Sequence, residues 1–226
     1  MFRWFLILAV TVCCIAGCGG STGDLGAGAL VDAGTFRALK NSDTWNYYLV
    51  WVHNGATYSD RTATVAISTV GSDLIYTLTV NFGVEYATQT FKFRFTQAGD
   101  GTLTIDGIQA IDQAAIEDAA PPVTSPAADA YATNDLTGTT VFDGRNLAID
   151  LANVGTENVD AADGNTYRCY KYDGTVDEDG NVMNFTLWIN PSIGNVVKLV
   201  YAYNVDVGGN VALLTATMLL RGKSLH

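Results

Sequence analysis

Three of the four cysteines in this chain lie within six positions, at Cys13, Cys14 and Cys18. Thiols this close together can form a disulfide or hold a metal ion. Both roles require the cysteines to remain in the mature protein. The residues that precede them therefore decide whether this chemistry is available.

The cysteines lie at the end of a short apolar segment. The residues from Phe5 to Ala16 carry no charge, and the only charge before them is that of Arg3. A helix needs roughly 20 apolar residues to cross a bilayer, so a segment of this length is typical of a secretory signal peptide. An uncleaved membrane anchor is the alternative interpretation.

The residues Ile15-Ala16-Gly17-Cys18 resemble the lipobox of bacterial lipoproteins. The resemblance implies that residues 1–17 are removed and that Cys18 becomes the lipidated first residue, held in the membrane by the two or three acyl chains of a diacylglycerol group and a palmitate. Each buried CH₂ contributes about 0.8 kcal/mol, so such an anchor is effectively permanent. Gly19 stands where resembling proteins carry the Asp that retains them in the inner membrane. The implied location is the cell envelope and, in a cell with two membranes, the outer membrane.

The remaining reactive side chains are few. Cys169 has no partner for a disulfide in the mature chain and lies in an alternating segment, so we expect a small buried residue. The two histidines, His53 and His226, are isolated, and no G-x-S-x-G motif is present. We therefore predict no metal site, no cofactor and no enzymatic activity. A hydrolase whose active site forms only in the fold is an alternative.

Charge limits the class of partner. The chain has 12 Lys and Arg against 23 Asp and Glu, a net charge of −11. Such a surface repels phosphate backbones, so we expect no nucleic acid partner. The acidic residues around Asp177 depart from the calcium-binding EF-hand spacing, because Thr175 occupies a ligand position. They predict a solvent-exposed hairpin turn.

The elements that must position any site are predicted to be strands. Thr, Val and aromatic residues alternate along most of the chain, and Asn54-Gly55 is typical of a hairpin turn. We predict an all-β, mainly antiparallel fold of about eleven strands, forming a curved sheet or half-barrel with one short helix. A β-sandwich of two packed sheets is the alternative.

The predicted domain organisation follows the composition. After the signal peptide (1–17), the lipidated terminus and a Gly- and Ala-rich flexible tether span 18–34, and a single β domain spans 35–226. Residues 109–135 interrupt the strand pattern. We expect a short amphipathic helix that ends near Ala119 and then a Pro-rich loop, or alternatively a disordered linker.

Aromatic side chains on the predicted strands are the candidate ligand-binding residues. Rings supply a large contact area with a polar tip, so they could line a cavity for an acyl chain or a glycan, although plain core packing is the alternative. The candidates are Trp45, Tyr47, Trp51, Tyr76, Trp188 and Tyr201.

Two stretches also resemble known families. Leu39 to Trp51 resembles the start of many uncharacterised bacterial lipoproteins, and Leu187 to Ala202 resembles their closing hairpin. The order of strands resembles the half-barrels of envelope lipoprotein carriers and receptors, whose concave face holds acyl chains. The resemblance implies an envelope lipoprotein that binds a hydrophobic ligand, such as a lipid, or a partner protein. A structural or surface interaction module with a functional loop near Ala119 to Tyr131 is the alternative.

Overall fold

The computed structural model describes residues 30–33, 37–53, 56–81, 88–109, 113–207 and 210–226. Within them the regular elements are strands and two short 3₁₀ helices, which confirms the predicted all-β, mainly antiparallel fold. The strands are β1 (Leu30–Val31), β2 (Thr44–His53), β3 (Ala56–Val70), β4 (Asp73–Asn81), β5 (Gln89–Gln97), β6 (Leu103–Gln109), β7 (Glu117–Thr124), β8 (Leu136–Phe142), β9 (Arg145–Asp160), β10 (Thr166–Glu178), β11 (Asn181–Asn190), β12 (Asn195–Val207) and β13 (Asn210–Ser224). The 3₁₀ helices are η1 (Ala128–Ala132) and η2 (Pro191–Ile193).

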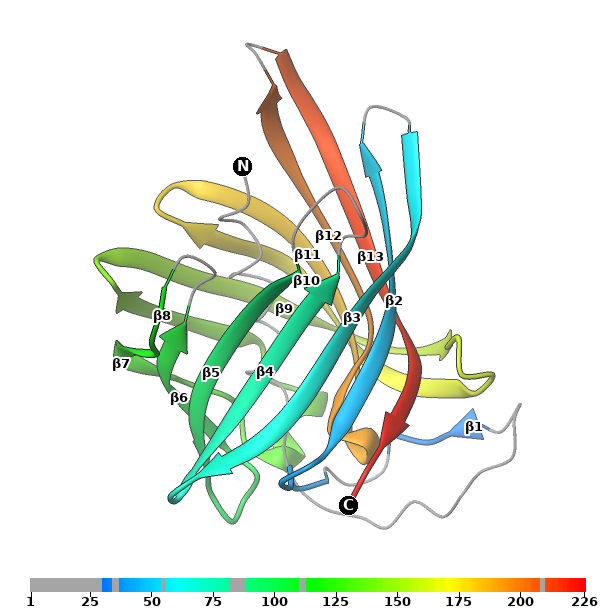
Figure 1. The fold of residues 1–226 in the computed structure, drawn as a ribbon. Helices are drawn as coiled ribbons and strands as arrows, with labels where there is room; N and C mark the ends of the chain where they lie inside the picture. Colours follow the sequence, from blue (N-terminus) through cyan, green and yellow to red (C-terminus); the bar gives the residue numbers. More distant parts are fainter. Residues whose placement is uncertain (1–29, 34–36, 54–55, 82–87, 110–112, 208–209) are drawn as a thin grey trace.

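Twelve of the described strands, β2 to β13, close into an up-and-down barrel (Figure 1). Each strand pairs antiparallel with the next along the chain, and β13 pairs with β2, where Ala216 lies opposite Trp51. The sheet thus curves further than the predicted half-barrel, and its thirteen described strands, twelve of them in the barrel, exceed the predicted number of about eleven. Closure gives the first and last barrel strands partners for backbone groups that an open sheet leaves unpaired.

Side chains along most of the barrel strands alternate between the inside and the outside, with interruptions where the register shifts. On β5, Phe91, Phe93 and Phe95 are buried, while Lys92 and Arg94 lie on the opposite face. Alternation of this kind follows from the two-residue repeat of a strand. The inside of the barrel is therefore apolar.

The predicted helix before Ala119 is wrong. Glu117 to Thr124 forms β7, which pairs with β6 on one side and, at Ala120, with β8 on the other. Pro121 and Pro122 cannot donate to the ladder, which fits the sparse pairing of this strand. Burial of Ala119 and Val123 against the barrel outweighs the helical spacing of the isoleucines before them. The strand is also part of the closed sheet, so these residues are not a linker.

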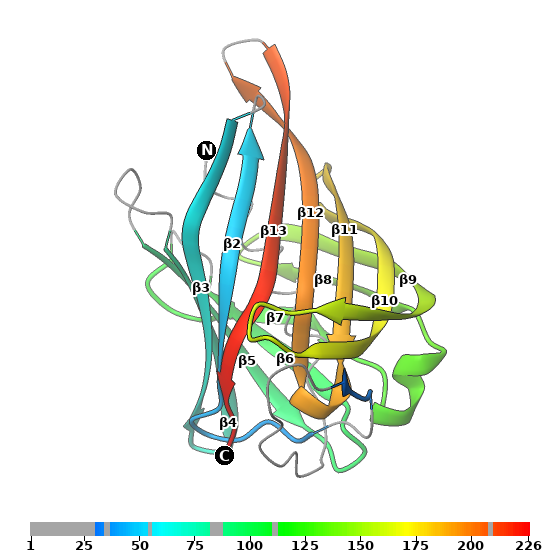
Figure 2. The same cartoon turned by 90° about the vertical axis from the view of Figure 1, so that its right-hand side faces the viewer.

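The lower half of the β9–β10 hairpin leaves the barrel wall. The register shifts at Lys171/Tyr172, and the hairpin tip reaches β13, where the Ala162 amide donates to the Leu220 carbonyl over 2.7 Å. Figure 2 shows this hairpin crossing the outside of β11 and β12. We call residues 155–171 the outer flap. Its buried face includes Cys169, as the sequence predicted, and burial raises the pKa of that thiol.

The segment before β2 packs on the domain. Leu30 and Val31 pair in parallel with Thr166 and Tyr167 of the flap, and Val31 and Ala33 are buried. The last residues of the predicted tether are thus part of the folded domain. The predicted signal peptide and Cys18 lie outside the described residues, as do Asn54 and Gly55. Among the described residues, no helix has the length and apolar character needed to cross a membrane.

Candidate functional site

Two of the six candidate aromatic residues hold the lower end of the barrel closed. Trp45 Nε1 donates to the Ile193 carbonyl over 3.1 Å, and the Tyr47 hydroxyl donates to the Val196 carbonyl over 3.0 Å. Both side chains are buried, and burial raises the pKa of Tyr47. These hydrogen bonds join β2 to η2 and to the start of β12. Trp45 and Tyr47 therefore pack the floor of the barrel.

Tyr76 and Trp188 lie away from each other. Tyr76 is buried on the inward face of β4 and packs edge-on against Phe93, with ring centroids 6.2 Å apart. Trp188 lies on the outward face of β11, between the ammonium groups of Lys171 and Lys198 at 5.2 and 4.5 Å from its ring. Trp188 is therefore a wall residue close to the outer flap, separate from the barrel interior.

Trp51 and Tyr201 meet on one level of the inner wall. Trp51 lies opposite Ala216, Ala216 lies opposite Tyr201, and Tyr201 lies opposite Phe185. The rings of Tyr201 and Phe185 stack at 5.8 Å, and Trp51 packs edge-on against Tyr58 at 5.6 Å. We call Tyr58, Trp51, Tyr201 and Phe185 the aromatic row. Ala216 is the small residue between its two halves.

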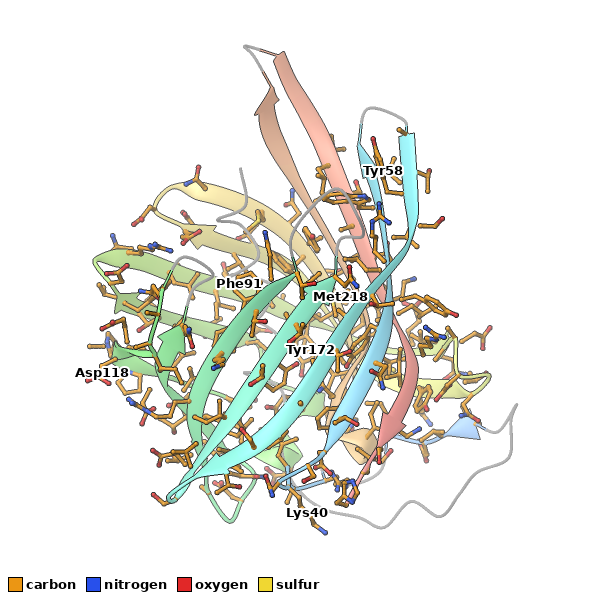
Figure 3. The ribbon with its side chains drawn as sticks, in the orientation of Figure 1. Lys40, Tyr58, Phe91, Asp118, Tyr172 and Met218 are labelled. Carbon is orange, nitrogen blue, oxygen red and sulfur yellow. The ribbon has the colours of Figure 1, made fainter. Side chains whose placement is uncertain are left out.

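The aromatic row belongs to the end of the barrel where the β2–β3 and β12–β13 hairpins extend past the other strands. We call it the upper end, after its place in Figure 1. Figure 3 places Tyr58 high on the β2–β3 hairpin, above Phe91 and Tyr172. Two inward residues at this end, Trp51 and Leu214, are 7% and 6% exposed, whereas Trp45 at the floor is at 0%.

Two polar residues that the sequence analysis did not single out also belong to the upper end. Arg61 lies opposite Leu49 and two residues from buried Ala63, so the register places it on the inward face of β3. Its Nε is buried and has no hydrogen-bond partner. Gln89 is 7% exposed, begins the inward series of β5, and has an Oε1 atom without a partner. The signal in the sequence was their spacing, because each residue lies two positions from a buried apolar residue and therefore on the same face of its strand.

Arg61 and Gln89 lie on the same inner wall, on two strands that are separated by β4. Ala63 pairs with Val80, and Val80 pairs with Gln89, so two strand spacings, about 10 Å, separate β3 from β5. Arg61 is one inward position above Ala63. On β4, Val80 lies opposite both Ala63 and Gln89. We call these two inward-facing polar residues near the upper end, Arg61 and Gln89, the polar patch.

A second arginine at the same end is compensated. Arg145 and Glu178 are both buried, and their closest charged atoms lie 3.9 Å apart. Asp143 lies 3.6 Å from the same guanidinium, which also lies over the Phe142 ring at 5.9 Å. A buried charge is tolerated when opposite charges surround it. Arg145 is therefore stabilised by its own neighbours.

Groups elsewhere that could do chemistry have structural roles. Lys223 Nζ donates to the Tyr167 hydroxyl over 2.6 Å, and that hydroxyl donates to Asp163 over 2.5 Å, which fastens the flap tip to β13. Burial and Asp163 raise the pKa of Tyr167, so the phenol stays protonated. In the part of the chain that the structure describes, no group of His, Cys, Asp and Glu is arranged to hold a metal ion.

Two hollows on the outside are polar. One of about 370 Å³ is lined by Asn46, Thr62, Thr64 and Arg221. Another of about 390 Å³ borders the β10–β11 turn, where Asp177 accepts from the Gly180 amide and Asp179 accepts from the Asn146 amide. The carboxylates of the acidic segment thus cap a hairpin turn. Neither hollow adjoins the aromatic row.

Comparison of the chain with protein-family models, curated proteins and solved structures gives no match.

Proposed function

We propose that this chain is a lipid-anchored protein of the bacterial cell envelope whose barrel binds a hydrophobic ligand at its upper end and catalyses no reaction. The observation that carries the proposal is the aromatic row, because it extends from an apolar interior to Trp51, which is 7% exposed at the upper end. Amphipathic rings around an apolar space are typical of sites for acyl chains and similar molecules.

The width of the barrel supports a binding role. An eight-stranded barrel is just wide enough for its own side chains or one small ligand, and the diameter grows with the number of strands. This ring has twelve. At its lower end large side chains such as Trp45 and Tyr47 fill the interior, so the binding space is assigned to the upper end, where small Ala216 lies between Trp51 and Tyr201.

The proposed anchor keeps this domain near a membrane. Cys18 and Leu30 are twelve residues apart, which corresponds to at most about 40 Å of extended chain. Mass spectrometry of the protein extracted from membranes tests the anchor. We expect a first residue Cys18 that carries acyl chains, and Cys18→Ala is expected to abolish both cleavage and acylation. A chain that retains residues 1–17 in the wild type would contradict this part of the proposal.

Ligand binding can be tested on a secreted form in which a cleavable secretory signal replaces residues 1–18. This form keeps every described residue and can be purified without detergent. Native mass spectrometry is expected to show an added mass that organic solvent releases as a lipid-like molecule. If only the bare chain is found, methyl dodecanoate is added to saturation, and absence of a complex would contradict the binding role.

A matched pair of variants locates the site. Ala216→Phe fills the space between Trp51 and Tyr201, so it is expected to abolish the complex. Ala202→Phe places the same side chain on the outward face of β12 and is expected to leave binding unchanged. Circular dichroism establishes that both variants are folded. Equal binding by the two folded variants would place the ligand elsewhere.

A further inference from the structure

Arg61 differs from the other described arginines in having no partner for its charge. Four of the others lie within 4.0 Å of a carboxylate: Arg37, Arg94, Arg145 and Arg168. The fifth, Arg221, lies over the exposed ring of Tyr48 at 4.6 Å. Arg61 has neither kind of contact among the described residues, and its Nε is buried.

The surroundings of Arg61 make this isolation costly. Its neighbours along the inner wall are Leu49 and then Met218, both buried and apolar. Burying a polar atom such as Arg61 Nε without a hydrogen-bond partner is unfavourable, and in a native protein it calls for an explanation such as a bound ion or ligand. The chain is rich in carboxylates, with 23 Asp and Glu, yet none pairs with Arg61 among the described residues.

Gln89 is the second, independent observation. Its side chain is more than nine-tenths buried, and its Oε1 has no partner. The oxygen and nitrogen of an amide exchange places by a simple rotation, so the NH₂ group can point into the same space. An amide NH₂ and a guanidinium are both donors, and together they suit an acceptor that carries negative charge.

We propose that the ligand is a single-chain amphiphile with an anionic head, and that Arg61 and Gln89 bind this head while the chain lies along the aromatic row. The inference rests on the proposed binding function and specifies its ligand class. A guanidinium binds carboxylate and phosphate through the same planar pair of N–H groups, so a fatty acid and an alkyl phosphate share the chemistry recognised here.

The negative charge of the protein sharpens this inference. A net charge of −11 disfavours the approach of any anion, so a general electrostatic attraction does not explain binding of an acid. The head must be recognised locally, and the apolar chain must supply the rest of the affinity. An uncharged ligand with the same chain lacks only the contact with Arg61.

Three probes with one chain length separate these contributions: dodecanoate, dodecyl phosphate and methyl dodecanoate. Their affinities for the secreted form are measured by isothermal titration calorimetry at pH 8, where the acid is ionised. We expect at least one anion to bind about tenfold more tightly than the ester, because a hydrogen bond to a charged group contributes roughly that factor. The preferred anion identifies the kind of head group.

Arg61→Met is expected to remove the preference for the anion and to leave the affinity for the ester unchanged. Arg168→Met is the matched control, because its side chain is 53% exposed on the outer flap, and it is expected to bind as the wild type does. Gln89→Leu provides a second variant at the same head site and is expected to reduce the preference severalfold.

The outcomes separate the two proposals. Equal affinity of the wild type for acid and ester, or an anion preference that survives in folded Arg61→Met, would overturn the anionic head while leaving the binding function in place. Failure of all three probes to bind would contradict the binding function itself. If Arg61→Met does not fold, Arg61 has a structural role, and the Gln89→Leu result decides whether the head is recognised at this patch.

Discussion

Two arginines near opposite ends of the barrel, Arg37 and Arg61, differ in whether their charge has a partner among the described residues. At the lower end, Arg37 and Asp43 form a two-pronged ion pair at 2.5 and 2.8 Å, and Asp43 also accepts from the backbone amides of Lys40 and His226. At the upper end, Arg61 and Gln89 have buried polar atoms without partners. The Arg37–Asp43 pair therefore stabilises the lower end, whereas Arg61 and Gln89 form an unfavourable arrangement that a ligand could relieve.

The largest expected effect is at the lower end. Asp43→Ala leaves the buried Arg37 guanidinium without its carboxylate and removes acceptors from two backbone amides. We expect a loss of about 3–5 kcal/mol in the free energy of unfolding, measured by urea denaturation. Asp150→Ala, on the exposed face of β9, is the control and is expected to change it by less than about 0.5 kcal/mol. Similar losses in the two variants would contradict the structural role of the lower end.

Asn190 is expected to have the next largest effect. Its buried amide donates to the carbonyls of Val31, Asp32 and Arg168, which ties the segment before β2 to the barrel. Asn190→Ala is expected to cost about 1–3 kcal/mol in unfolding free energy, since three buried carbonyls lose a donor. The control is Asn184→Ala, on the exposed face of β11. Faster amide exchange at Val31 in Asn190→Ala but not in Asn184→Ala would establish that Asn190 holds the segment before β2. Equal exchange in the two variants would refute this role.

The flap tip is expected to respond to acid. Burial raises the pKa of Asp163, but the hydrogen bonds that it accepts from Tyr167 and the Asn165 amide outweigh burial, so its pKa in the folded protein lies below the ordinary value of 3.8. The stabilisation is therefore present above that value and is lost as the pH falls through the lower pKa of the folded state. The protection of the amides of residues 156–169 against hydrogen exchange, relative to an unstructured chain at the same pH, is expected to fall below about pH 4.

Tyr167→Phe tests the same contact at neutral pH. It removes the hydroxyl that bridges Lys223 and Asp163, with an expected cost of about 1 kcal/mol. Exchange in the flap is expected to rise while exchange in the β2–β3 ladder stays unchanged. Tyr170→Phe is the control on the same hairpin. No difference between the two variants would mean that the tip is held by packing alone.

The smallest stability effect is expected at the upper end, in contrast with Asp43. Arg61→Met replaces a partly buried cation that lacks a partner with an apolar side chain of similar length. We expect the free energy of unfolding to stay the same or to rise by up to about 1 kcal/mol. Thermal unfolding without ligand measures this. If Arg61→Met lowered the free energy of unfolding as much as Asp43→Ala, Arg61 would have the same stabilising role as Asp43, which would contradict the comparison.

The sequence predicts local features of this fold better than its closure. The alternation of Phe91, Phe93 and Phe95 determines one face of a strand from neighbours alone, and it is confirmed. The pairing of β13 with β2 joins segments from opposite ends of the domain. No local pattern specifies such a contact, so the sequence indicated a curved sheet without showing that it closes. The apolar spacing before Ala119 likewise predicted a helix, but Glu117 to Thr124 forms a strand because it pairs with β6, a contact that the local pattern does not show.

The candidate site was only partly accessible to sequence reasoning. Aromatic residues on strands indicated the right kind of surface, but Trp45 belongs to the floor and Trp188 to the outer wall. A register shift beside Trp188 and the folding back of the flap depend on tertiary contacts. Arg61 was missed because small and weakly polar residues alternate along β3, which leaves its inward face unmarked in the sequence.

The three tryptophans retained in the secreted form test the central contrast most directly, because Trp45, Trp51 and Trp188 lie at the floor, at the upper end and on the outer wall. A dodecanoate brominated near the end of its chain quenches the fluorescence of nearby indoles. If the ligand binds at the upper end, Trp51→Phe abolishes most of the saturable quenching, and Trp45→Phe and Trp188→Phe retain it. Loss of quenching in either of the latter variants, with Trp51→Phe unaffected, would contradict a ligand site at the upper end.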